Sequence, residues 1–107
     1  MDTALTLAWV APESDGGAAI TNYVIEFRME GQLQWKRLTE NTIEKLTHRA
    51  TKLQEGQTYE FRVAAENKAG QGPFSDPSAP VLVKEPIGKY ISSAYLNITL
   101  KLAVLLI

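Results

Sequence analysis

The residues able to do chemistry are few and are scattered along the chain. His48 is the only histidine, and the sequence contains no cysteine. A zinc site needs several clustered Cys or His ligands, and a catalytic site needs a nucleophile or an acid–base pair that meets in one pocket. His48 shares the phase of Ala50 in an alternating segment, which favours a packed structural role. We therefore expect no catalytic residue, no metal site and no cofactor.

Acidic and glycine-rich stretches are the remaining candidates for a small-ligand site. The acidic pairs within 13–15 and 40–44 fall in polar, irregular sequence, so we expect solvated carboxylates there and no calcium site. Gly70-Gln71-Gly72 lacks the third glycine and the strand-to-helix setting of a dinucleotide-binding loop. This motif predicts a turn.

Composition and charge describe one ordinary globular domain. The chain has 107 residues, of which 45% are apolar and 21% charged, a length that suits a single core. Eleven Lys and Arg against 12 Asp and Glu give a formal net charge of -1. Because no positive field attracts phosphates, we expect neither a nucleic-acid nor a membrane partner. The absence of cysteine favours an intracellular setting, with the core held by packing alone.

Short alternating segments, separated by turn signals, predict the secondary structure. Pro, Asp and Gly gather at 12–17, and Gly, Asn and Pro gather at 67–73. Between such stretches apolar and polar residues alternate with a period of two, and no segment sustains a helical period. We expect strands at 3–9, 20–29, 34–38, 46–50, 59–65 and 81–83. Several short strands at such spacing predict an all-β fold of two packed sheets, a β-sandwich.

The predicted core consists of the apolar residues that share the inward phase of these strands. It comprises Leu5, Leu7, Trp9, Tyr23, Ile25, Phe27, Trp35, Leu53, Tyr59, Phe61, Val63 and Ala65.

An ordered set of motifs carries a family resemblance. The motifs are L-x-L-x-W, D-G-G-x-x-I-x-x-Y-x-I-E-x-R, L-x-E-G-x-x-Y-E-F-R-V-x-A-E-N-x-A-G-x-G and S-x-P-S, in that order along residues 5–78. Together they resemble the fibronectin type III domain, an immunoglobulin-like sandwich. The amino-acid sequences of the motifs are similar to those in the domains of titin, twitchin and related muscle proteins. No single motif is diagnostic, whereas the ordered set is specific.

The resemblance implies a non-enzymatic structural and protein-interaction module of a larger multidomain protein in the cytoplasm, at the sarcomere. A kinase domain elsewhere in such a parent protein is compatible with this interpretation. Implied partners are other proteins, among them myosin or neighbouring immunoglobulin-like and fibronectin type III domains. The candidate partner-contact loops contain Asp15, Gly16, Gly17, Asn67, Lys68, Gly70 and Gly72. The alternative is an extracellular adhesion or receptor domain, against which stand the lack of an R-G-D tripeptide, a W-S-x-W-S sequence and cysteine.

Two of the predicted strands, 20–29 and 59–65, define a register if they are antiparallel neighbours. The register pairs Phe27 with Phe61, Ile25 with Val63 and Tyr23 with Ala65 inside, and Glu26 with Arg62 and Arg28 with Glu60 outside. A slip by one residue would turn the apolar set outward, so the core fixes the register.

Tyr59 follows a Glu-Gly turn at the start of its strand. This position suits a tyrosine corner, in which the hydroxyl bonds to the backbone a few residues upstream. The competing interpretation is a tyrosine that only packs.

The sequence departs from the family pattern at both ends. The family places a proline-led first strand before the strand of Trp9, and only eight residues precede Trp9 here. We therefore expect a fibronectin type III-like domain over residues 1–87 that lacks this strand, with an exposed edge on a two-stranded sheet.

Residues 88–107 match nothing in the family and form an anomalous apolar tail in which apolar residues alternate from Leu96 to Leu106. Three interpretations remain open. The tail is a substitute strand on the vacated edge, a membrane span, or non-native sequence, because Gly88-Lys89-Tyr90 resembles translation across a splice donor. The span interpretation is the weakest, because a span needs about 20 apolar residues.

Overall fold

The computed structural model describes residues 5–12, 16–51, 53–83 and 95–99, and within them every regular element is a strand. The strands are β1 (Leu5–Val10), β2 (Asn22–Met29), β3 (Lys36–Arg37), β4 (Thr47–Ala50), β5 (Thr58–Asn67), β6 (Gly70–Gln71), β7 (Val81–Leu82) and β8 (Tyr95–Thr99). The predicted all-β fold is confirmed. The predicted strands agree with β1 to β5 and β7 to within a few residues, while β6 lies inside the stretch at 67–73 that the sequence predicts to be a loop.

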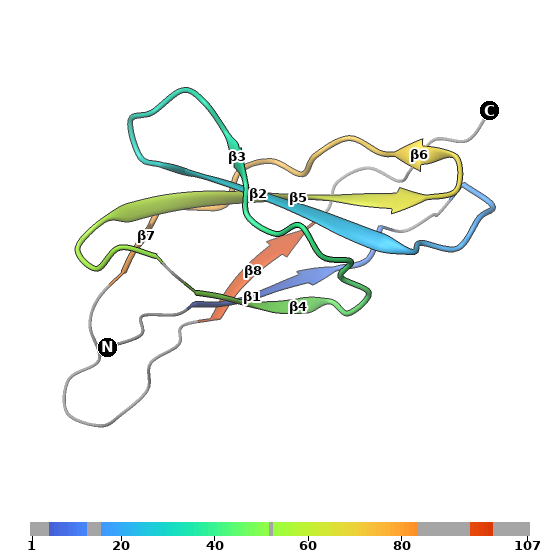
Figure 1. Ribbon diagram of the computed structural model, residues 1–107, viewed down its shortest axis with the longest axis horizontal. Helices are drawn as coiled ribbons and strands as arrows, with labels where there is room; N and C mark the ends of the chain where they lie inside the picture. Colours follow the sequence, from blue (N-terminus) through green and yellow to red (C-terminus); the bar gives the residue numbers. More distant parts are fainter. Residues whose placement is uncertain (1–4, 13–15, 52, 84–94, 100–107) are drawn as a thin grey trace.

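Two sheets form the layers of the sandwich (Figure 1). One sheet has the order β4-β1-β8. The other has the order β3-β2-β5-β6, with β7 also paired to β5. The long strands β2 and β5 dominate the second sheet, and they place one face against the first sheet and the other toward solvent.

The β2–β5 ladder has the register that the sequence predicts. Phe27 pairs with Phe61, Ile25 with Val63 and Tyr23 with Ala65, and the charged residues pair as Glu26 with Arg62 and Arg28 with Glu60. The buried apolar set explains this outcome, because a slip would expose Phe61 and Val63, each worth about 1.5–3 kcal/mol when buried.

The core lies between the two sheets. Leu5, Leu7 and Trp9 of β1 face Tyr23, Ile25, Phe61, Val63 and Ala65 of the opposite sheet, and Ile43, Ala50, Leu53, Tyr59 and Val83 complete the cluster. All of these side chains are buried, and Phe27 is partly buried against them. Trp9 meets Tyr23 edge-on, with ring centroids 5.5 Å apart, a geometry that aromatic rings favour.

Two serines extend the edge of β5 where three prolines interrupt the chain. The N–H groups of Ser75 and Ser78 donate to the carbonyls of Val63 and Phe61, at 2.8 and 2.7 Å. In return their hydroxyls accept from the N–H groups of Val63 and Phe61, at 3.1 and 3.0 Å. Because Pro77 cannot donate a main-chain hydrogen bond, these side chains replace part of a regular ladder.

The tyrosine corner that the sequence predicts is present. The hydroxyl of Tyr59 accepts a hydrogen bond from the N–H of Gln54 at 2.9 Å. Gly56 makes the intervening turn at a φ of 88°, a conformation that suits glycine. The ring of Tyr59 is buried, so the corner ties the turn to the core.

The outer edge of β1 differs from the expectation. The sequence predicts a two-stranded sheet with an exposed edge on β1, whereas β8 runs parallel to β1 along that edge, from the pair Thr6–Tyr95 to the pair Val10–Thr99. This pairing favours the substitute-strand interpretation of the tail. Residues 84–94 and 100–107, which include Gly88-Lys89-Tyr90 and Leu106, lie outside the described residues.

Candidate protein-interaction surface

Trp35 lies on the outer face of the β2–β5 sheet, which corrects the core position predicted from its sequence. It is partly exposed and does not belong to the buried cluster. The cause is the register of β3, which pairs Phe27 with Lys36 and Glu26 with Arg37. Paired residues point to the same face of a sheet. Trp35 therefore shares the outward phase of Arg37 and Glu26.

Two guanidinium groups lie close to the indole ring of Trp35. The Cζ atoms of Arg28 and Arg62 lie 4.3 and 4.4 Å from the ring centroid. The Cζ atom of Arg62 also lies 4.1 Å from the ring centroid of Phe74. These distances are within the range of cation–π contacts. We call this surface the Trp35 face, and it consists of Glu26, Arg28, Trp35, Glu60, Arg62 and Phe74.

Carboxylates hold both arginines of the Trp35 face in place. Nε of Arg28 donates to Oε1 of Glu60 at 2.8 Å, and Nε of Arg62 donates to Oε1 of Glu26 at 3.0 Å. The four charged side chains are between 18% and 27% exposed. Because each arginine is fixed by an ion pair and a ring, the face is preorganised for contact with a partner.

The chemistry of the Trp35 face suits binding and lacks the parts of a catalytic site. Each charge is matched by an opposite one, and the face holds no nucleophile beside a base. Tryptophan and arginine are the residue types that most often dominate the binding energy of protein interfaces. Among the described residues, no cluster of three His, Cys, Asp or Glu side chains forms a potential metal site.

Only some residues of the predicted contact loops are exposed to solvent and so accessible to a partner. Lys68 and Gly70 are exposed, and Gly72 is half-buried. Asn67 is instead buried: its Nδ2 donates to the carbonyl of Ala18 at 3.3 Å and its Oδ1 accepts from the N–H of Ala69 at 2.8 Å. Asn67 thus fastens the two loops together, which corrects its predicted role as a contact residue.

The other predicted loop lies at 15–18. Gly16 is half-buried and Gly17 exposed, and both have positive φ angles, of 72° and 102°. Asp15 lies outside the described residues. The loop backbone therefore makes a tight turn that suits glycine.

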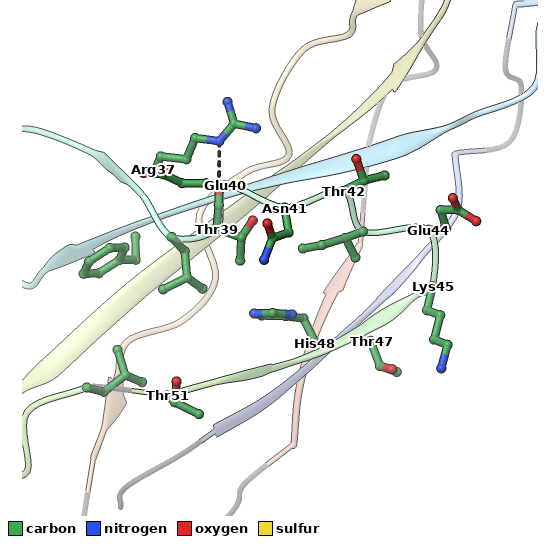
Figure 2. Close-up of a pocket in the computed structure, with 14 residues that line it drawn as sticks. Arg37, Thr39, Glu40, Asn41, Thr42, Glu44, Lys45, Thr47, His48 and Thr51 are labelled. Atoms are coloured by element: carbon green, nitrogen blue, oxygen red, sulfur yellow. Dashed lines mark hydrogen bonds between the residues drawn. The ribbon is translucent and has the colours of Figure 1, made fainter.

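A cleft of about 1010 Å³ opens between β4 and the irregular segment that follows β3. Figure 2 shows the imidazole of His48 projecting from β4 toward Thr39 and Asn41. Burial lowers the pKa of His48, because desolvation penalises the charged imidazolium. Arg37 and Lys45 are balanced by Glu40 and Glu44 in the lining. The lining of the cleft therefore carries no excess charge that would attract an anion or a cation.

The described residues contain no helix long and apolar enough to cross a membrane. Taken together, two packed sheets, a tyrosine corner and a rigid aromatic–arginine face define a non-catalytic, immunoglobulin-like β-sandwich module. The family model described as "Fibronectin type III domain" matches residues 1–81. The chain belongs to the fibronectin type III family, and the predicted resemblance is confirmed.

Its relatives are muscle proteins. The chain is 39% identical over 93 residues to human myomesin-2, covering 86% of this chain and 6% of that protein. It is 37% identical over 83 residues to human cardiac-type myosin-binding protein C, covering 78% of this chain and 6% of that protein. The solved titin module A71 from human cardiac muscle matches with a TM-score of 0.68 and 36% identity, covering 74% of this chain and 77% of that one. The chain thus spans one module's share of far longer proteins, and it is a non-catalytic structural module like theirs.

Proposed function

We propose that this chain is a structural, protein-binding module of a larger striated-muscle protein located at the sarcomere, and that it contacts its partner through the Trp35 face. The observation that carries the proposal is the contact of the Trp35 ring with the guanidinium groups of Arg28 and Arg62, each held by a carboxylate. A large aromatic side chain in fixed position loses little conformational entropy on binding. The candidate partners are myosin and neighbouring immunoglobulin-like or fibronectin type III domains.

Similarity to muscle proteins supports the choice of partner class. One relative is named for binding myosin, and it shares 37% identity with this chain over 83 residues. The near-neutral charge of the chain also agrees with a protein partner, since nucleic acids are bound mainly by excess Lys and Arg.

The direct test is cosedimentation of the purified chain with filaments of striated-muscle myosin. We expect Trp35→Ala to weaken binding by about 2 kcal/mol or more, roughly 30-fold, as truncation of an interface hot spot does. Leu46→Ala is the matched control, because Leu46 is also a large exposed apolar residue, 40% accessible, but precedes β4 of the other sheet. We expect this control to bind like the unmodified chain.

A folded Trp35→Ala variant that binds myosin as well as the unmodified chain would contradict the role of the face. If the unmodified chain does not bind myosin, myosin is excluded as the partner. Trp35→Ala is then tested against the adjacent domains of the parent protein.

A further inference from the structure

The outer edge of β1 presents main-chain groups at alternate residues. The N–H of Trp9 donates to the carbonyl of Leu46, at 3.0 Å, on the side of β4. Main-chain groups of successive strand residues point to opposite neighbours. The main-chain groups of Thr6, Ala8 and Val10 are therefore directed away from β4, toward the outer edge.

That edge is occupied by a parallel strand from the far end of the chain. β8 pairs Thr6 with Tyr95, Ala8 with Asn97 and Val10 with Thr99. In a parallel ladder, a residue bonds to the two residues that flank its partner. Ala8 therefore faces the carbonyl of Leu96 and the N–H of Ile98, whereas the N–H of Asn97 is directed away from β1.

We propose that the outer edge of β1 is a strand-acceptor site for an extended peptide in parallel orientation, with residues 95–99 as the resident donor strand. The ligand class is peptide backbone, recognised by the alternate N–H and C=O groups of Thr6, Ala8 and Val10. The site lies on the sheet opposite to the Trp35 face. It is therefore independent of the proposed function.

Pairing of a further strand with the outer edge of β1 stabilises the sheet. An open edge exposes a row of unpaired main-chain groups, and a two-stranded sheet has little stability of its own. β1 also carries Leu5, Leu7 and Trp9, all of them buried in the core. Holding β1 on both sides therefore fixes these three core side chains in place.

Hydrogen exchange of single amides in the full chain tests the site. In the unmodified chain we expect the N–H of Ala8 to be protected, because it faces β8, and the N–H of Trp9 to be protected by Leu46. Ile98→Pro removes the donor that faces Ala8 and puts a proline ring against β1. We expect it to speed exchange at Ala8 by about tenfold or more, while Trp9 stays protected.

Asn97→Pro is the matched control. This substitution restricts φ in the same way, one residue earlier in the chain. The N–H that it removes is directed away from β1, and an edge strand tolerates proline at such a position. We expect Ala8 to keep its protection in this variant. Equal loss in both variants would overturn the parallel register, and fast exchange of Ala8 in the unmodified chain would overturn the pairing.

A synthetic peptide of residues 94–100 then tests the acceptor in trans. Added at millimolar concentration to the Ile98→Pro chain, it should restore protection at Ala8, because a tethered strand acts at roughly millimolar effective concentration. No restoration would overturn the acceptor site. If Ile98→Pro also exposes Trp9 and so unfolds the sheet, backbone nuclear Overhauser contacts between Ala8 and Leu96 in the unmodified chain decide, and their absence contradicts the proposal.

Discussion

At the residue scale, a few polar side chains satisfy main-chain groups that the strand ladders leave open. Tyr59 accepts from Gln54, and Ser75 and Ser78 accept from the edge of β5. Each of these bonds joins an irregular segment to a strand that carries core residues. Because an unmet buried donor costs more than an average hydrogen bond contributes, these side chains decide where loops are rigid.

Tyr59→Phe tests the tyrosine corner. Removal of the hydroxyl leaves the N–H of Gln54 without its partner, so we expect the free energy of unfolding to fall by about 1–2 kcal/mol. For a domain of this size the melting temperature should fall by about 4–8 °C per kcal/mol. Chemical denaturation followed by tryptophan fluorescence measures the difference.

Tyr23→Phe is the control for this measurement. Tyr23 is also a buried ring in the core, but its hydroxyl makes no hydrogen bond with the described residues. We expect a change within about 0.5 kcal/mol. Equal losses in the two variants would mean that the ring, and not the bond to Gln54, holds the turn.

Single residues also mark the limits of sequence reasoning. Tyr59 was predictable because the Glu55-Gly56 turn fixes its place. Trp35 was not, because β3 has two residues, Lys36–Arg37, and so short a strand carries no alternation from which a face can be inferred. The face of Trp35 follows from the strand pairing. Phe27 faces inward and pairs with Lys36, so Lys36 has the inward phase, and Trp35, the residue before it, faces outward. Asn67 carried a signal too, since Asn readily bonds to a backbone N–H two residues on, here that of Ala69.

At the scale of elements, the register of the β2–β5 pair is fixed by its buried apolar residues and reinforced by the charged residues on its outer face. Apolar and charged residues alternate in both strands, so one register satisfies both faces, and the sequence was sufficient to predict it. The same reasoning did not reach β6, whose Gly70–Gln71 has no apolar residue, and for the tail it left three interpretations open, one of which is the pairing of β8 with the edge of β1. A parallel partner is chosen by a free edge far away in the sequence, and the alternation within 95–99 does not identify it.

A double-mutant cycle on Glu26 and Arg62 tests the surface of this pair. We expect a coupling of about 0.2–1 kcal/mol, as for other facing ion pairs on a sheet. Arg62→Ala alone should cost more than Glu26→Ala alone, because Arg62 also contacts Trp35 and Phe74, at about 0.5–1 kcal/mol for each ring. Equal single costs, measured by urea denaturation, would contradict a contribution from the rings.

At the scale of the whole molecule, the two sheets share the core but differ in the surface that they present. The sheet of β1, β4 and β8 contributes Leu5, Leu7, Trp9 and Ala50 to the core, and its outer edge takes a strand. The sheet of β2, β3 and β5 contributes the larger set of core residues and presents the Trp35 face to solvent. The fold was predictable from motifs and periodicity, and so was the pairing of 26–28 with 60–62, whereas the positions of Trp35 and Phe74 beside these charges come from the folded structure.

The most direct test of binding through the Trp35 face is a nuclear magnetic resonance titration of the isotope-labelled chain with striated-muscle myosin. We predict that signal loss concentrates at the indole N–H of Trp35 and at the amides of 26–28 and 60–62, and spares β4. Signal loss centred on β4 or on the loop at 68–72, with the Trp35 indole unaffected, would contradict the account.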